Sequence, residues 1–192
     1  MIVTKIQLKN WKNFGEVNAK CGKRVFLIGP NASGKSNFLD ALRFLRDVSQ
    51  DGLKNAVDIR GGIKAVRYLC ARRQPDVGIV VNLDNMWEYG LSFTSQNGMH
   101  RITKEYVIQS VDNKKTKLLD RPNNEDRQDE MRLTQTALQQ VNVNKEFRDI
   151  ADFFSSIQYR HILPQLVRDP KSFSPSPSKM YLKNLNYPFT RG

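Results

Sequence analysis

The sequence predicts an α/β fold, and three stretches of the chain support this prediction. A short apolar run at residues 24–28 leads into a glycine-rich loop, and apolar residues at helix spacing follow the loop. Between residues 77 and 119, apolar and polar residues alternate, which is typical of antiparallel strands with one buried face. With 192 residues, the chain is long enough to bury one sizeable core.

The first strand is expected at residues 2–8. Ile2, Thr4, Ile6 and Leu8 share one face of this stretch, and Lys5 lies between them on the other face. The chain is expected to turn at residues 11–17 and to return toward the apolar run 24–28. That run is short and continuous, so it predicts a buried parallel strand.

The glycine-rich loop fits the pattern G-x-x-x-x-G-K-[ST] with Gly29, Pro30, Asn31, Ala32, Ser33, Gly34, Lys35 and Ser36. Glycines allow the backbone to curl so that successive N–H groups point at a phosphate. In this motif the lysine reaches the β- and γ-phosphates, and the serine hydroxyl binds Mg²⁺. The loop therefore predicts binding of a nucleoside triphosphate such as ATP, together with Mg²⁺.

A helix is expected after the loop, because Phe38, Leu42 and Leu45 recur at helix spacing. Asp58 then begins a D-x-x-G pattern of the kind that GTPases use. A GTPase is disfavoured, because no apolar strand precedes Asp58 and the guanine-reading N-K-x-D has Phe147 in place of its aspartate. The glycines at 61 and 62 are more simply explained by a turn.

The alternating stretch predicts a meander of antiparallel strands, with turns at residues 95–98 and 112–114. Asp84 follows an apolar run and could be mistaken for the Mg²⁺-binding aspartate of a Walker B strand. We reject that assignment because Asn82 interrupts the run and Asn85 stands where a catalytic acid is needed.

The remaining chain alternates between polar and apolar stretches. Residues 120–130 predict an exposed polar loop, and the stripes at 133–141 and 147–154 predict two helices. Residues 157–163 predict a further strand. From residue 169 to 192, proline and serine are frequent enough to predict a flexible tail or a truncated linker.

The composition limits the environment and the partners of the chain. A formal net charge of +12 indicates an acidic partner such as nucleic acid, although a solvated basic surface would also explain it. Apolar runs are too short for a membrane helix, and no secretion signal begins the chain. Cys21 and Cys70 are too few for a disulfide framework. We therefore expect a cytoplasmic protein that does not contact a membrane.

The loop and its neighbours resemble the RecF/SMC/OLD branch of ABC-type ATPases. The resemblance lies in the loop with Asn37, in the sequence F-L-D-A-L at 38–42, and in L-K-N-W-K-N-F at 8–14. It implies the N-terminal lobe of an ABC-type head at residues 1–168, with a P-loop NTPase core, an antiparallel β-subdomain and flanking helices. Such proteins bind ATP and Mg²⁺, dimerise through their heads, and act on DNA in repair or in defence against phage.

The resemblance also implies further site residues. Lys12 and Asn13 would lie near the nucleotide, although an ordinary hairpin turn would explain them equally well. A glutamine after a strand touches Mg²⁺ in these ATPases. Gln165 is favoured over Gln158 for this role because it follows the predicted strand, and an ordinary surface glutamine is the alternative.

The other catalytic parts of such a head are not recognisable in the sequence. No signature motif and no Walker B glutamate follow Gln165, so no catalytic residue is assigned to this chain. The chain is then either truncated or completed by a second chain, and alone it is expected to hydrolyse ATP poorly. A nuclease or another effector subunit is a further implied partner. A non-catalytic subunit that senses nucleotide or binds nucleic acid is the alternative, and the long meander disfavours a small-molecule kinase.

Overall fold

The computed structural model describes residues 1–71, 75–96, 98–112 and 114–160. The fold below lies in the unit Met1–Gln158; of the following unit, Tyr159–Gly192, only residues 159 and 160 are described. The predicted domain boundary at residue 168, the tail at 169–192 and Gln165 therefore lie outside the described residues and stay predictions.

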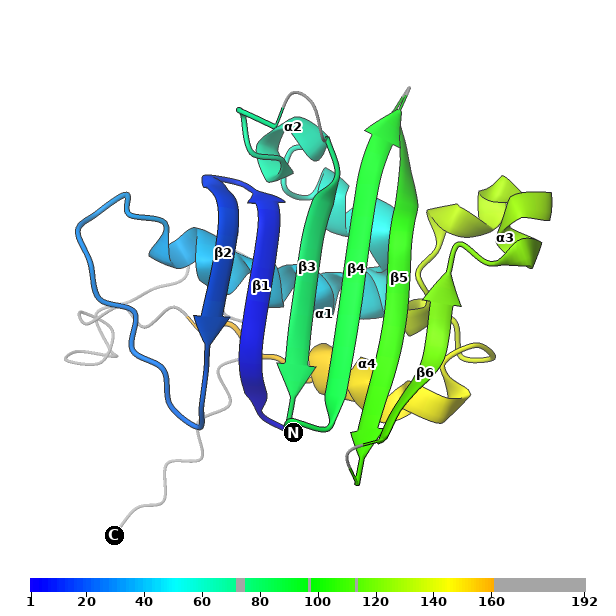
Figure 1. Ribbon diagram of the computed structural model, residues 1–192. Helices are drawn as coiled ribbons and strands as arrows, with labels where there is room; N and C mark the ends of the chain where they lie inside the picture. Colours follow the sequence, from blue (N-terminus) through cyan, green and yellow to red (C-terminus); the bar gives the residue numbers. More distant parts are fainter. Residues whose placement is uncertain (72–74, 97, 113, 161–192) are drawn as a thin grey trace, which may run out of the picture. The chain divides into compact units, whose positions relative to one another are not determined.

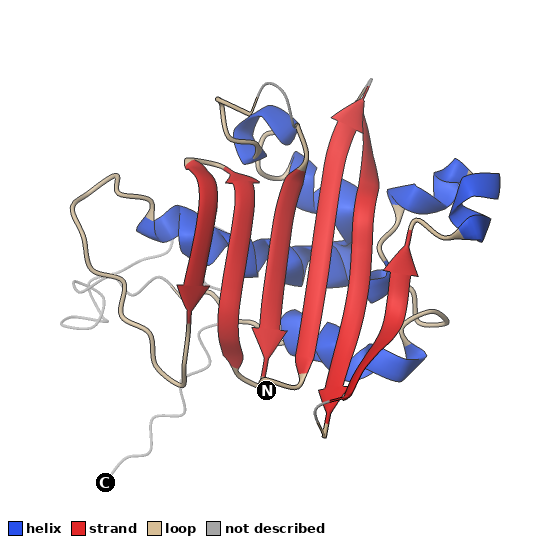
Figure 2. Ribbon diagram, in the orientation of Figure 1, coloured by secondary structure: helices blue, strands red, loops and turns tan. Residues whose placement is uncertain are grey.

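One antiparallel sheet of six strands forms the centre of the fold (Figures 1 and 2). Its strands lie in the order β2-β1-β3-β4-β5-β6, so that β3 to β6 form a meander of consecutive neighbours. The strands are β1 (Val3–Trp11), β2 (Phe14–Lys20), β3 (Val77–Leu83), β4 (Trp87–Gln96), β5 (Met99–Val111) and β6 (Lys114–Arg121). The strands predicted from alternation at residues 2–8 and 77–119 are confirmed. The turn expected at residues 11–17 is shorter, because β2 begins at Phe14, and residues 157–160 of the strand predicted at 157–163 form no strand.

The helices are of unequal length, and the two longer ones, α1 and α4, cover one face of the sheet (Figure 1). They are α1 (Lys35–Asp58), α2 (Ile63–Val66), α3 (Asn124–Gln128) and α4 (Arg148–Ser155), with short 3-10 turns η1 (Glu130–Thr134), η2 (Ala137–Gln139) and η3 (Lys145–Phe147). The helix predicted at 133–141 is wrong, because this stretch forms separate turns, whereas the next stripe forms α4. None of the helices in the described part could span a bilayer.

The core lies between the sheet and the two longer helices. Phe44 of α1 packs against Trp11 of β1 and Phe93 of β4, with ring centroids 5.1 and 5.3 Å apart. Phe154 of α4 contacts the ring of Tyr89 at 5.6 Å. All of these rings are fully buried, so the position of α1 relative to the sheet is fixed by aromatic packing.

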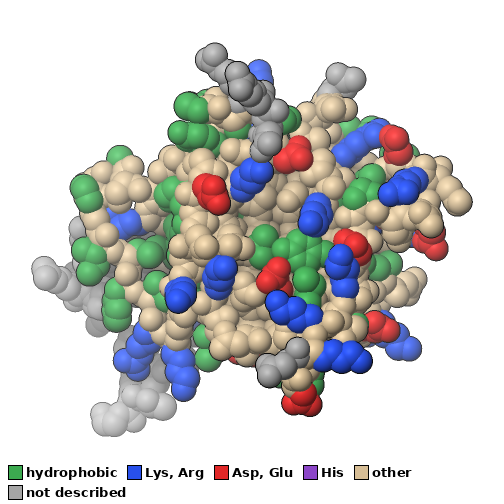
Figure 3. Space-filling view, in the orientation of Figure 1, with side chains coloured by type: hydrophobic (Ala, Val, Ile, Leu, Met, Phe, Trp, Pro, Cys, Tyr) green, Lys and Arg blue, Asp and Glu red, His purple; other side chains and the backbone are tan. Residues whose placement is uncertain are grey.

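The opposite face of the sheet is not covered by the described helices (Figures 1 and 3). Strand register places polar and basic side chains in rows across it. One row contains Lys20, Lys5, Asn82, Glu88, Ile108 and Lys117. Lysine and arginine side chains are spread over this face in Figure 3, with aspartate and glutamate side chains between them. We call it the open face.

The buried strand predicted at residues 24–28 is not formed. This stretch is a loop outside β2 that leads to α1 (Figure 1), and Phe26 and Ile28 are 82% and 94% exposed. A strand needs a neighbour for its backbone groups, and the sheet is complete without this stretch. The apolar run therefore has no partner strand in the described part of the chain.

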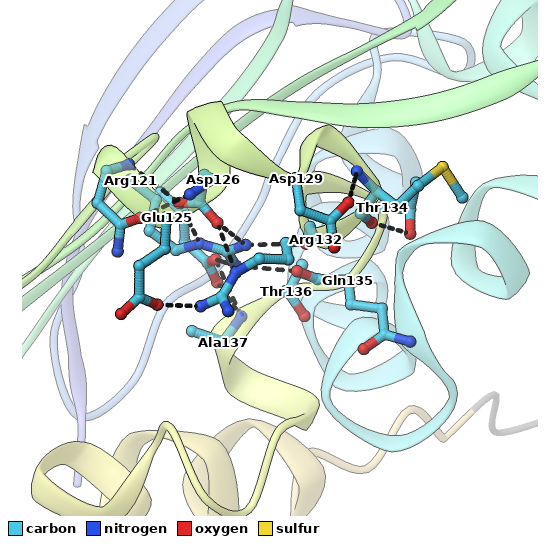
Figure 4. Close-up of polar contacts among 12 residues, drawn as sticks. Arg121, Glu125, Asp126, Asp129, Arg132, Thr134, Gln135, Thr136 and Ala137 are labelled. Carbon is cyan, nitrogen blue, oxygen red and sulfur yellow. Dashed lines mark hydrogen bonds and ion pairs between the residues drawn. The ribbon is translucent and has the colours of Figure 1, made fainter.

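A buried ion-pair network anchors the segment that follows β6 (Figure 4). Arg121 donates to both oxygens of Asp126, at 3.0 and 2.8 Å, and to Glu105 at 3.1 Å. Its guanidinium also donates to the backbone carbonyls of Arg132 and Gln135, at 2.8 and 2.9 Å. Both carboxylates are fully buried and share the one buried guanidinium, and the partly exposed Arg132 adds a second cation 3.4 Å from Asp126.

The same network corrects the prediction that residues 120–130 form an exposed loop. Arg121 and Asp126 are buried, and Asp126 closes a capping box with Asn123 at the start of α3. Burial raises the pKa of Glu105, against the opposing effect of hydrogen bonds from the Ala137 amide, Arg121 and Tyr89. Polar residues are buried here because they pair with one another, which composition alone does not reveal.

Candidate functional site

The loop of residues 29–36 curls into the first turn of α1. Gly34 caps the helix with φ 99° and ψ 4°, a left-handed conformation that favours glycine. A Cβ at this position would also lie 2.7 Å from Phe14 Cζ. The second glycine of the motif is therefore required both by its backbone angles and by the close approach of the β1–β2 hairpin.

Loop amides are available to an anion. The amide of Ser33 donates to the carbonyl of Pro30 at 3.4 Å, which forms the turn. The amides of Asn31, Ala32 and Gly34 donate to no acceptor within the described residues. Together with the positive end of α1, free N–H groups of this kind suit a phosphate.

Lys35 lies against its own loop. Its ammonium donates to the carbonyls of Gly29 at 2.8 Å and Pro30 at 2.6 Å, and it lies 3.5 Å from the hydroxyl of Ser33. Phosphate oxygens entering the loop would compete with these neutral carbonyls for the ammonium. A phosphate oxygen is charged and forms the stronger hydrogen bond, so the Lys35 ammonium is placed to move from the two carbonyls to a phosphate.

Ser36 is the second residue of α1 and is exposed. Its hydroxyl forms no hydrogen bond with the described residues, so it is free to bind a cation beside the phosphates. None of the described histidine, cysteine and acidic side chains form a group of three that could hold a metal ion.

The tip of the β1–β2 hairpin packs on the start of α1. The side-chain nitrogen Nδ2 of Asn37 donates to Asn13 Oδ1 at 2.8 Å, and Trp11 Nε1 donates to the backbone carbonyl of Asn37 at 2.7 Å. The structure therefore brings the predicted Asn13 and Asn37 together beside Gly34. Sequence reasoning proposed both residues only through the family resemblance.

Lys12 is placed differently from Asn13. Its ammonium pairs with Asp40 at 2.7 Å, and the same carboxylate accepts from Arg60 Nε at 3.0 Å. Desolvation acts to raise the pKa of Asp40, but the hydrogen bonds from Arg60 and Lys12 outweigh it and lower the pKa below its usual value. Arg60 also pairs with Asp47 at 2.8 Å.

The ion pairs that Asp40 forms with Lys12 and Arg60 join the β1–β2 hairpin to α1 and to the turn after α1. Sequence reasoning missed Asp40 and Arg60, although an acidic residue one turn into the helix and an arginine before two glycines were visible signals. The D-x-x-G reading of Asp58 finds no support, since Asp58 pairs with Lys54 at 2.6 Å and lies 3.2 Å from His100 Nε2. Asp84, rejected as a Walker B residue, accepts from the Ile2 amide at 2.7 Å.

Comparison with known proteins gives one family. A family model described as "AAA domain, putative AbiEii toxin, Type IV TA system" matches residues 24–188, which includes the whole loop and α1. No curated protein matches the chain. The match begins at the apolar run that precedes the loop.

Proposed function

The chain belongs to this family of AAA domains, which makes it a P-loop ATPase domain, and on that premise we propose that it binds ATP and Mg²⁺ through residues 29–36. The observation that supports this most directly is the curled loop with Lys35 folded over it. Lys35 would bind the β- and γ-phosphates, and the free loop amides would bind the phosphate oxygens between them. Asn13 and Asn37 would bound the site on the hairpin side.

Ser36 would hold Mg²⁺ at the same place, since its hydroxyl has no partner in the described chain. When bound, Mg²⁺ would offset the negative charge of the phosphates. The protein residues then supply orientation, and the helix N-terminus adds a fixed positive potential. Gln165, which the resemblance implies as a further contact of the ion, lies outside the described residues and stays a prediction.

Isothermal titration calorimetry with ATP, with and without Mg²⁺, tests the proposal. Lys35→Ala should weaken ATP binding by about tenfold to a hundredfold, because a charge-assisted hydrogen bond contributes about 1.5–3 kcal/mol. Lys54→Ala is the matched control, since Lys54 lies on the same helix and is exposed. Equal ATP affinity in wild type and Lys35→Ala would refute the assignment.

We further propose that the domain is the N-terminal lobe of an ABC-type head of RecF/SMC/OLD character. The exposed apolar run at 24–28 supports this, because it stands directly before the loop and its backbone pairs with no described strand. A C-terminal lobe or a second chain would add a strand there and supply the Walker B glutamate. Alone, the chain should turn over ATP poorly, and robust turnover that Lys35→Ala abolishes would contradict this.

Action on DNA, in repair or in defence against phage, belongs to the same proposal and rests on the resemblance and on the net charge of +12. Dimerisation through the heads and a nuclease or other effector partner rest on the resemblance alone. The net charge also favours a second candidate, a non-catalytic subunit that senses nucleotide or binds nucleic acid. A longer native gene product with the missing motifs would favour the ATPase head.

A further inference from the structure

A cavity of about 330 Å³ lies on the open face of the sheet, away from the helices that form the ATP site. Its lining combines two kinds of side chain. Lys5, Lys20 and Lys115 supply positive charge, whereas Met86 and Ile108 supply apolar surface. A nucleotide has a negatively charged phosphate and a base whose flat faces pack against apolar side chains, so both parts find complementary walls here.

The side-chain ammonium groups of Lys5, Lys20 and Lys115 form no hydrogen bond or ion pair with the residues that the structure describes. Lys5 and Lys20 even lie directly opposite each other in the β1–β2 pair. Like charges at opposing positions destabilise a sheet, so this arrangement costs stability and returns none within the described fold.

The acid in the cavity is already engaged. Among the described residues that line it, Glu88 is the one carboxylate. Asn82 Nδ2 donates to one oxygen of Glu88 at 3.0 Å, and the Tyr106 hydroxyl donates to the other at 2.9 Å. The carboxylate is thereby held by neutral donors and leaves the three lysine ammonium groups unpaired.

Basic residues continue along the face beyond the cavity. Lys117 lies in the same row as Lys5, one strand past Ile108, where it pairs with Asp120 at 2.8 Å, a contact that a phosphate would have to replace. Lys104 lies 5.2 Å from the ring of Tyr106, which packs flat over Gly90 in the middle of the sheet. A ligand confined to the cavity would not need these outlying cations, whereas a chain of phosphates would contact them in succession.

From this juxtaposition we propose that the open face binds single-stranded nucleic acid, with Lys5, Lys20 and Lys115 holding the phosphates of a nucleotide seated in the cavity. The inference deepens the proposed action on DNA and rests on it. The nucleic acid would lie on the face of the sheet opposite α1, so its binding is separable from ATP binding. A flat, wide sheet face presents stacking and charge without reading base sequence.

Fluorescence anisotropy with a fluorescein-labelled oligothymidylate tests this proposal. The test variant combines Lys5→Ala, Lys20→Ala and Lys115→Ala. The control combines Lys54→Ala, Lys64→Ala and Lys145→Ala, which removes the same charge from the helices. The test variant should raise Kd at least about tenfold and reduce the slope of log K against log salt by about 2, because each single-strand phosphate contact contributes about 0.7.

The control variant should change Kd by less than about twofold, and an equal loss in both variants would overturn the proposal as a non-specific charge effect. Equal affinity for duplex DNA, or competition by free AMP at the same concentration, would also overturn it. Folding is checked by circular dichroism, and the test variant should be no less stable than wild type because the Lys5–Lys20 repulsion is removed.

ATP titrations on the same variants distinguish this inference from the proposed function. If the triple variant of Lys5, Lys20 and Lys115 keeps the ATP affinity of wild type but loses oligonucleotide binding, the open-face proposal is supported. Lost ATP binding in Lys35→Ala with unchanged oligonucleotide binding supports both sites as independent. If wild type binds ATP but no oligonucleotide, the open-face proposal alone fails.

Discussion

Replacing Arg121 by methionine should strongly destabilise the domain. The guanidinium is 5% exposed and pairs with Glu105 and Asp126, both 0% exposed. It also satisfies two backbone carbonyls in the segment after β6. Arg121→Met would leave two buried carboxylates and two part-buried carbonyls without this partner, whereas the methionine would preserve most of the side-chain volume.

The expected loss is about 3–5 kcal/mol, the cost of removing one partner from a buried ion pair. Since domains of this kind unfold with about 5–15 kcal/mol, the loss is a large share of the total. At about 2–4 °C per kcal/mol for a domain of this size, Tm should fall by about 6–20 °C. Urea unfolding followed by circular dichroism at neutral pH measures the free energy, and a thermal scan measures Tm.

Arg101→Met is the matched control for this experiment. Arg101 pairs with Glu130 at the surface, where the two side chains are 34% and 65% exposed. Such pairs contribute about 0–1 kcal/mol, so the control should lose little stability. A triple variant that adds Glu105→Gln and Asp126→Asn to Arg121→Met should recover part of the loss. If Arg121→Met costs no more than Arg101→Met, the reasoning about buried charge is wrong.

Three other substitutions give sharp expectations. Asp40→Asn should destabilise the fold near neutral pH. Arg60 and Lys12 hold the pKa of Asp40 in the folded state below 3.8, so the charged carboxylate stabilises the fold above that pH. This contribution disappears as the pH falls through the folded pKa. Urea midpoints from pH 7 to pH 3 should therefore converge with wild type in acid, and a constant gap would contradict this. Gly34→Ala should weaken ATP binding in calorimetry, since φ 99° strains any L side chain there. Gly52→Ala, at φ 85°, should cost about 1–3 kcal/mol in urea unfolding, whereas Gly22→Ala, where a Cβ meets nothing within 4 Å, should be near neutral.

Alternation of side chains was sufficient to predict most of the sheet. Residues 77–83 and 87–96 keep a period of two because one face is buried under α1 and the other meets solvent. The glycine loop and the start of α1 were also predicted, since their local sequence fixes their backbone. Local signals of this kind do not depend on distant partners.

The predictions that failed concern residues whose structure depends on partners elsewhere in the chain. Residues 24–28 satisfy every local criterion of a strand, but a strand forms only where a neighbour accepts its backbone groups. Arg121 and Asp126 look like surface residues until they are placed beside Glu105, which is far away in the sequence. In the site, Asp40 and Arg60 were missed for the same reason, because their pairing joins separate segments.

The order of the strands has a consequence for how the chain acquires its shape. Four successive strands, β3 to β6, each pair with the next one along the chain, so these contacts close only short loops. Proteins rich in such local contacts fold quickly, and domains fold from the N-terminus as the ribosome releases them. We expect β3 to β6 to assemble during synthesis, while the exposed apolar run at 24–28 stays unpaired with the described strands and is prone to aggregation.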